Sequence, residues 1–244
     1  MVAKLVIIPT LNEVENVEKI ISSVFLLQED FSVLIVDDQS TDGTQSLVKE
    51  MAKENDQLFY IFRTGKKGLG KAYVDGFKWA LKKGFDYIFQ MDADFSHDPK
   101  DLNRLYKTCQ ASNYDMAIGS RYVKGVNVVN WPMKRILLSW FASKYVKFIT
   151  RMPIEDSTAG FVCYKRKILE NLNLDKIKFV GYAFQIEMKY KIYQLNYKIK
   201  EVPVIFTDRE KGKSKMNARI IKEAVFGVLK LKLKKCLNIN EKFS

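Results

Sequence analysis

The sequence predicts an α/β protein with a mostly parallel central sheet and helices on both faces. Short apolar runs alternate with segments of helical character along the first half of the chain, and this alternation is typical of strand–helix–strand units. The runs are continuously apolar, as in residues 5–8 (LVII), which indicates strands buried on both sides. The 244 residues, 47% of them hydrophobic, can bury a sizeable core. Because the sequence has no internal repeat and no low-complexity linker, we expect one domain.

The first unit consists of a strand at residues 5–8, a turn at Pro9 and a helix. We expect Asn12 to cap that helix, with Glu13 and Glu15 in its first turn, where carboxylates interact favourably with the helix dipole. The remaining strands of the first half are expected at residues 32–36, 58–63, 86–94 and 114–122, and the helices after Gly43, at 68–84 and at 98–110, with Pro99 near the start of the last.

The second half of the chain is more mixed. We expect a helix with interleaved aromatic and basic residues at 131–149, a strand followed by a helix within 157–172, and another helix at 182–197. Residues 198–206 indicate an extended edge segment, since Pro203 cannot donate a hydrogen bond to a neighbouring strand. A basic loop and a terminal helix are expected at 207–235.

Cysteine usage and hydropathy indicate a cytoplasmic location. Cys109, Cys163 and Cys236 form no closely spaced pair, which argues against a disulfide framework or a zinc knuckle and fits a reducing compartment. Met1 leads directly into a short apolar run that lacks the length and cleavage site of a signal peptide. The longest stretches without a charged residue span nine residues, whereas a membrane-spanning helix needs about 20. We therefore expect no transmembrane segment.

Positive charge is concentrated in the second half of the chain. Residues 1–120 carry 14 Lys and Arg against 18 Asp and Glu, whereas residues 121–244 carry 27 against 10, within a total net charge of +13. A basic half suits nucleic acid, an anionic membrane or phosphorylated substrates. Composition alone does not separate these partners.

Acidic residues follow two of the expected strands. In parallel sheets ligands bind beyond the carboxyl ends of the strands, and Asp37–Asp38, Asp92 with Asp94, and Arg121 all fall at such ends. Asp92 and Asp94 would point to the same side of an extended segment, which suits a hard divalent cation that also binds phosphates, with Ser96 as a further ligand. The alternative is that this Asp-Ala-Asp segment caps the following helix. The single histidine, His97, has no neighbouring His or Cys that could complete a zinc site. We expect it to form local hydrogen bonds.

Two other loops have both a functional and a local interpretation. The acids of "VDDQSTDGT" can accept hydrogen bonds from a nucleoside or can form an Asx-rich turn. Residues 65–72 (GKKGLGKA) nearly match a phosphate-binding loop, but Ala72 stands where a hydroxyl is needed, which favours a glycine-rich start of a helix.

Basic segments lie in the last third of the chain. Arg209, Lys211, Lys213 and Lys215 surround Gly212, so this loop can close over a pyrophosphate or remain a solvated run of charge. Residues 219–235 alternate apolar and basic positions, which suits a helix in an anionic membrane interface. Packing on the protein's own core is the alternative, and residues 133–149 allow both interpretations.

Nine segments in order resemble family 2 glycosyltransferases, specifically the dolichyl-phosphate (polyprenyl-phosphate) mannosyltransferases. They cover about residues 4–217: "VIIPTLNEVENV", "LIVDDQSTDGT", "GLGKAYVDGF", "MDADFSHDP", "IGSRYVKG", "STAGFVCYKR", "YAFQIEM", "EVPVIF" and "REKGKSKM". The resemblance implies a Rossmann-like nucleotide-sugar-binding domain of GT-A type at residues 1–217. Residues 218–244 would then form a basic amphipathic helix and tail.

The resemblance also implies roles for individual residues. It places Pro9, Leu11, Glu13, Val36 and Asp38 around the nucleoside, although Leu11 stands where the family often has Tyr. It assigns Asp92, Ala93 and Asp94 to the donor and to a Mg²⁺ or Mn²⁺ ion, with Ser96 as a further metal ligand. Phosphate contacts would come from Arg121, Arg135, Arg209 and Lys215, and the catalytic residues would be Asp92, Asp94, Arg209 and Lys215.

The implied reaction is inverting transfer of mannose from GDP-mannose to a polyprenyl monophosphate. A related enzyme using UDP-glucose or another nucleotide sugar is the alternative, because the motifs do not discriminate the base or the hexose. We expect peripheral association with an anionic membrane on its cytoplasmic face and no nucleic-acid partner, and a separate membrane-anchor subunit remains open. A P-loop NTPase and a nucleic-acid-binding module are the rival classes, which nucleotide preference and salt-sensitive RNA or DNA binding would distinguish.

Overall fold

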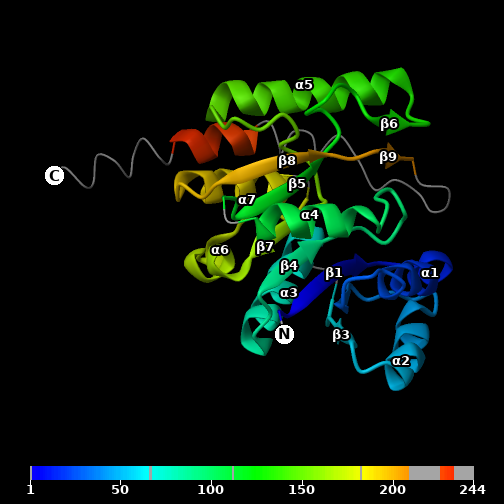
Figure 1. The fold of residues 1–244 in the computed structure, drawn as a ribbon. Helices are drawn as coiled ribbons and strands as arrows, with labels where there is room; N and C mark the ends of the chain where they lie inside the picture. The colour runs from blue at the N-terminus through cyan, green and yellow to red at the C-terminus, as the bar shows by residue number, and fades with distance from the viewer. Residues whose placement is uncertain (1, 66–67, 112, 182, 209–225, 234–244) are drawn as a thin grey trace.

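A seven-stranded sheet organises the computed structural model (Figure 1), which describes residues 2–65, 68–111, 113–181, 183–208 and 226–233. The spatial order of its strands is β3-β2-β1-β4-β7-β5-β8. These strands are β1 (Lys4–Thr10), β2 (Phe31–Asp37), β3 (Leu58–Phe62), β4 (Tyr87–Gln90), β5 (Met116–Ser120), β7 (Val162–Lys165) and β8 (Ile199–Pro203). All neighbouring pairs are parallel except those that β7 forms with β4 and β5. The sheet is therefore mostly parallel, as the sequence predicts.

Helices cover both faces of the sheet, because successive side chains of the buried strands point to opposite sides. Leu5 and Ile7 belong to one hydrophobic cluster and Val6 and Ile8 to the other. One face carries α1 (Val14–Phe25), α2 (Thr44–Glu54) and α4 (Asp101–Gln110), and the other carries α3 (Leu69–Lys83), α5 (Met133–Thr150), α6 (Arg166–Asn171), a 3-10 turn (Leu174–Lys176) and α7 (Ala183–Gln194).

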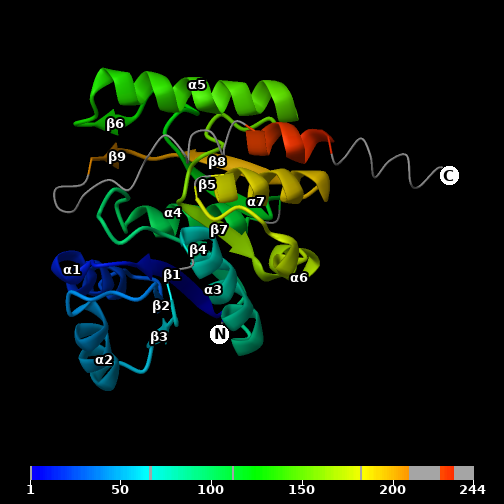
Figure 2. The ribbon, with the colours of Figure 1, turned by 180° about the vertical axis from the view of Figure 1, so that it is seen from behind.

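A second, two-stranded parallel sheet of β6 (Val128–Val129) and β9 (Phe206–Thr207) lies next to one end of α5. Residues 226–233 are helical, and in both views this helix lies between α5 and α7 (Figure 2). Val228 of that helix is buried in the same cluster as residues of α3, α6 and α7. One side of the terminal helix thus packs on the protein's own core.

Local predictions differ from the structure at three points. Asn12 is not the cap of α1: Glu13 occupies that position, and Asn12 adopts a left-handed conformation with φ 57°. The Asn12 side chain instead accepts a hydrogen bond from the amide of Thr41 at 2.9 Å. β4 ends at Gln90, so Asp92 and Asp94 lie on a loop and not on the strand. α4 begins at Asp101, two residues beyond Pro99.

The edge assignment of residues 198–206 is confirmed. β8 is the outermost strand on its side of the sheet, and Pro203 is its last residue. An edge position tolerates a proline because one side of the strand has no partner that needs a backbone N–H.

Candidate functional site

One edge of the sheet collects the chemically interesting residues. β1, β2, β4 and β5 all end there because they run parallel. β7 runs in the opposite direction between β4 and β5, so the residues that precede it, 156–160, reach the same edge. β8 runs parallel to β5 and brings residues 204–208 there as well. Among the described residues, the edge is thus built from six segments that come from different parts of the sequence.

The ends of β1 and β2 bring the five predicted nucleoside-site residues into one region. Pro9 and Val36 are register partners, and the amide of Asp38 donates to the carbonyl of Thr10 at 2.9 Å. Leu11 and Glu13 follow β1 directly, and both are partly buried. The structure therefore brings together the residues that the resemblance groups, while their contact with a nucleoside stays a prediction.

The two adjacent acids after β2 have different partners. Asp37 accepts hydrogen bonds from the Ser40 amide at 2.8 Å and from the Thr10 hydroxyl at 2.7 Å, which is the local turn that the sequence allows. The Asp38 carboxylate accepts from Arg63 at 2.7 Å and from the Gly68 amide at 2.9 Å. Asp38 is thereby fixed in place at the edge of the site.

In the glycine-rich segment, Gly68 is the cap of α3 and residues 69–72 form its first turn. The Gly68 amide is used by Asp38, and the Gly70 amide donates to the carbonyl of Val180 at 2.8 Å. A Cβ at Gly70 would lie 2.6 Å from the Phe179 carbonyl oxygen, so a glycine is needed here for close packing. These contacts favour the helix-start interpretation over a phosphate-binding loop.

The Asp-Ala-Asp segment does not cap the following helix. The residue at the cap of α4 is Lys100, and no side chain caps that helix, so the capping alternative is wrong. Ala93, Asp94 and Ser96 are buried, and the Ser96 amide donates to Oδ1 of Asp94 at 3.1 Å. The loop is folded around the Asp94 carboxylate.

Asp92 is oriented by a residue that the motif analysis missed. The hydroxyl of Tyr73, on α3, lies 3.4 Å from Oδ1 of Asp92 and 3.3 Å from the Met91 carbonyl. Burial raises the pKa of Tyr73 well above its usual range, and the charge of Asp92 raises it further. The phenol therefore stays protonated and donates to these oxygens.

The donor set fits a hard divalent cation. Two carboxylates and a hydroxyl, from Asp92, Asp94 and Ser96, fall within five residues of one loop, and oxygen ligands are those that Mg²⁺ and Mn²⁺ prefer. Among the described residues, no group of three or more His, Cys, Asp or Glu side chains gathers to hold a metal ion. A cation here would thus complete its shell with water or substrate phosphates, which is how Mg²⁺ is usually bound.

His97 packs between aromatic rings. Its ring lies 4.8 Å from that of Phe161 and 5.2 Å from that of Phe206, centroid to centroid. Burial lowers its pKa to about 4, and its Nδ1 atom has no hydrogen-bond partner among the residues that the structure describes. At this nitrogen the structure differs from the expected hydrogen-bonding role.

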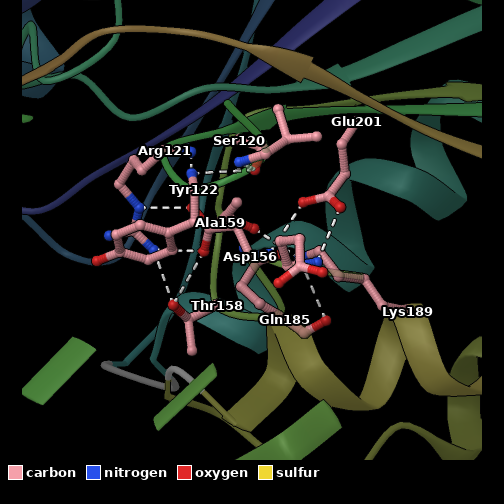
Figure 3. Close-up of polar contacts among 11 residues, drawn as sticks. Ser120, Arg121, Tyr122, Asp156, Thr158, Ala159, Gln185, Lys189 and Glu201 are labelled. Atoms are coloured by element: carbon pink, nitrogen blue, oxygen red, sulfur yellow. Dashed lines mark hydrogen bonds and ion pairs between the residues drawn. The ribbon is translucent and has the colours of Figure 1, made fainter. Parts of the chain in front are cut away.

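Arg121 is held by an acid that sequence reasoning did not single out. Its backbone amide and Nε donate to Oδ2 of Asp156 at 3.0 and 2.6 Å, and its Nη2 donates to Oδ1 at 2.6 Å (Figure 3). Nη2 also donates to the Thr158 hydroxyl at 2.8 Å. Burial by itself would raise the pKa of Asp156, but the Arg121 guanidinium holds it below its usual range.

Arg121 and Arg135 contact the same indole ring. The guanidinium carbons of Arg121 and Arg135 lie 5.4 and 4.0 Å from the centroid of Trp131. Arg135 also pairs with Asp208 at 2.7 Å, and both side chains keep about a quarter of their surface exposed. Two cations therefore lie together beside the loops of the sheet edge, and their contact with phosphates stays a prediction. Arg209 and Lys215 lie outside the described residues.

Residues 5–172 match the model of glycosyl transferase family 2. The chain belongs to that family. Polyprenol monophosphomannose synthase of Mycolicibacterium smegmatis is 44% identical over 225 residues, 92% of this chain and 84% of that protein. Undecaprenyl-phosphate mannosyltransferase of Micrococcus luteus is 40% identical over 224 residues, 92% of this chain and 91% of that protein.

Solved structures of two glycosyltransferases support the GT-A fold. Glucosyl-3-phosphoglycerate synthase of Mycobacterium tuberculosis, solved with Mn²⁺, UDP-glucose and phosphoglyceric acid, superposes with a TM-score of 0.68 at 16% identity and covers 96% of this chain and 79% of its own. A mannosyltransferase of Pyrobaculum calidifontis, solved with GDP-mannose and Mn²⁺, gives a TM-score of 0.60 at 19% identity over 96% of this chain and 64% of its own. The GT-A type predicted from the sequence is confirmed.

Proposed function

We propose that this chain transfers mannose from GDP-mannose to a polyprenyl monophosphate, giving polyprenyl-phosphate mannose and GDP with inversion at the sugar carbon. The observation that carries the proposal is that one edge of the sheet has an acidic half and a basic half. Asp92 and Asp94 form an acidic half suited to a cation and a diphosphate, and Arg121 and Arg135 form a basic half suited to a second phosphate. Relatives named for mannose transfer to polyprenyl phosphates, at 40–44% identity, support this reading.

The acceptor needs little activation. A phosphate monoester has a second pKa near 6 and is largely dianionic at neutral pH, so its oxygen can attack the sugar carbon without a strong base. This agrees with a pKa of about 4 for the only histidine. The work of Arg135 would be to hold the acceptor phosphate against Trp131 in line with the bond that breaks.

Departure of the nucleoside diphosphate is the harder step. Asp92 and Asp94, with Ser96, are the residues that would hold Mg²⁺ or Mn²⁺. When bound, such an ion neutralises charge on the leaving diphosphate. Tyr73 would keep the Asp92 carboxylate turned towards the site. Arg209 and Lys215 are proposed to add positive charge beside the same diphosphate.

We also propose that the protein binds an anionic membrane surface from the cytoplasmic side. α5 exposes Phe141 and Phe148, 59% and 81% of their surface, and the helix 226–233 exposes Phe226 and Leu233 while Val228 is buried. Lysines stand beside these apolar side chains on both helices, which is the composition of an interfacial helix. In the described part of the chain, none of the helices has the length and hydropathy that crossing a bilayer requires.

The deciding experiment offers the purified chain a polyprenyl phosphate, Mg²⁺ or Mn²⁺, and either GDP-mannose or UDP-glucose, followed by mass analysis of the lipid. We expect a gain of one hexose from GDP-mannose and release of GDP. Hexose gain only from UDP-glucose would replace the donor assignment, and transfer from neither donor would overturn the proposal.

A further inference from the structure

A fully buried lysine lies beneath the segment that joins the two halves of the site. Lys189 is on α7 and has no solvent-exposed surface. Its ammonium donates to the carbonyl of Ala159 at 2.6 Å and to that of Gln185 at 3.5 Å (Figure 3). Since burying a lysine is costly unless it has partners, this position needs an explanation beyond helix formation.

Lys189 belongs to a compact group of four charged side chains. Asp156 and Glu201 favour its charged form, whereas Arg121 disfavours it. Glu201, on β8, accepts hydrogen bonds from the amides of Glu155 and Asp156 at 2.8 and 2.9 Å. Two cations and two anions thus offset one another around the start of the segment 156–160 (Figure 3).

The segment 156–160 contacts both halves of the site. At its first residue, Asp156 fixes the guanidinium of Arg121. At its last residue, a Cβ added to Gly160 would lie 3.8 Å from Oδ2 of Asp92 and 3.5 Å from Nε2 of Gln185. The Ala159 carbonyl that Lys189 holds is directly beside this glycine. The position of Asp92 relative to Arg121 therefore depends on how firmly these five residues are held.

We propose that Lys189 is a positioning residue: it fixes the segment 156–160 and so sets the spacing between Asp92 on the donor side and Arg121 on the acceptor side. This inference rests on the proposed function for the identity of the two sides. It assigns no contact between Lys189 and a substrate. Its effect would be on alignment, and small misplacements of reacting groups lower turnover more than they lower binding.

The test compares Lys189→Met with Lys191→Met in the full chain. Lys191 is a matched control because it also donates from α7 to a backbone carbonyl, that of Lys176 at 2.9 Å, but lies in a more exposed position. For Lys189→Met we expect kcat to fall about 10-fold, the effect typical of losing an outer supporting contact. KM for each substrate should change much less, and the control should match the wild type.

A purely structural role would give a different pattern. It would lower the melting temperature and the amount of folded protein, but kcat per folded molecule would stay at the wild-type value, and that outcome would overturn the proposal. If Lys189→Met does not fold, Lys189→Gln tests the same contact, because its shorter, uncharged side chain does not reproduce the hydrogen bond from Nζ to the Ala159 carbonyl. It should show the same loss of kcat with little change in KM, and an unchanged kcat would again contradict the proposal.

Amide hydrogen exchange of the segment 156–160 gives a readout that does not depend on activity. Exchange should be faster in Lys189→Met than in the wild type and in Lys191→Met, because a held carbonyl is released. Unchanged exchange would show that Lys189 does not hold the segment. If the wild type were inactive but exchange were still faster in the variant, the proposed function would be wrong. The role of Lys189 in holding the segment 156–160 would still be supported.

Discussion

The hydroxyl of Tyr73 lies 3.4 Å from Oδ1 of Asp92; Tyr73 is completely buried, whereas Asp92, on the loop after β4, is only partly buried. Tyr73 is on α3, and its ring is stacked on that of Phe184 with the planes only 3° apart. The phenol is thus held rigidly by packing from two helices. The packing therefore fixes the direction of the hydrogen bond that the Tyr73 hydroxyl donates to the Asp92 carboxylate.

Tyr73→Phe should lower kcat about 10-fold, because it removes a hydrogen bond that orients a ligand of the proposed cation. The ring and its packing remain, so the fold should persist. Steady-state kinetics at varied Mn²⁺ should also show a weaker apparent affinity for the metal. Tyr164→Phe is the control: it removes another buried hydroxyl, which donates to Gln90 at 2.6 Å. If both variants lose activity equally, the orienting role is wrong.

Asp94→Ala should abolish turnover while the chain stays folded. Loss of a group that stabilises the leaving diphosphate typically costs on the order of 10²–10³ in rate, and excess chelator should have the same effect on the wild type. Activity assays with circular dichroism measure both properties. Asp98→Asn serves as the control, since Asp98 is an exposed acid of the same loop whose side chain accepts a local amide hydrogen bond from Lys100. Full activity in Asp94→Ala or in chelator would refute the metal site.

Arg135→Ala should raise KM for the polyprenyl phosphate about 10-fold, the equivalent of one charge-assisted hydrogen bond of roughly 1.5 kcal/mol. KM for GDP-mannose should not change, because Arg135, which lies beside Trp131, is proposed to bind the acceptor and not the donor. Arg104→Ala is the comparison, since Arg104 also pairs with an aspartate, Asp101, on the far helix α4. If the KM for GDP-mannose rose instead, the assignment of Arg135 to the acceptor phosphate would be wrong.

Replacing both Phe141 and Phe148 by Ser should weaken binding to anionic vesicles. Each exposed ring would lose part of the 1.5–3 kcal/mol that full burial of such a side chain contributes, so we expect an affinity loss of about 10-fold or more. Vesicle cosedimentation at low and high salt measures the effect, and added salt should weaken the wild type as well. Leu26→Ser, at an 85% exposed leucine after α1, should bind as the wild type does. Equal binding by all three proteins would exclude α5 from the membrane surface.

Lys189→Met should change the pH dependence of stability. Burial lowers the pKa of Lys189 from 10.5 to about 7, so between these values the unfolded chain binds more protons and the stability of the wild type rises with pH. The variant lacks this contribution. The free energy of unfolding of Lys189→Met relative to wild type should therefore be highest near pH 7 and decline towards pH 9.5. Denaturant titrations across this range test the trend, and a difference that is constant with pH would contradict it.

Residues at the ends of parallel strands could be placed from sequence, because strand direction and hydrophobic runs fix where each chain segment leaves the sheet. Asp38 and Asp92 were found in this way. Asp156 was not, since a short apolar run such as residues 161–164 (FVCY), which includes most of β7, does not reveal the direction of its strand. Only an antiparallel β7 brings the residues before the strand to the functional edge. The sequence does carry one indication of a site there: residues 156–160 (DSTAG) combine an acid with small polar residues, a composition typical of a functional loop.

Lys189 was missed for a related reason. A lysine in a helical pattern normally marks the exposed face, but α7 is buried along Ala183–Tyr190 on every side. No periodicity distinguishes a buried lysine in such a helix from an exposed one. The cap of α1 was misplaced because Asn12 forms hydrogen bonds with residues of the next loop, Ser40 and Thr41, and a sequence pattern read locally does not contain such long-range partners.

Burial of Val228 has a practical consequence for anyone who shortens this protein. The helix 226–233 places Val228 in the core cluster shared with α3, α6 and α7, and the backbone at Gly227 lies close against the ring of Phe179. A truncation before residue 226 would remove these contacts and expose apolar surface of that cluster to water. Shortened forms of the chain should therefore be less stable than forms that keep this helix.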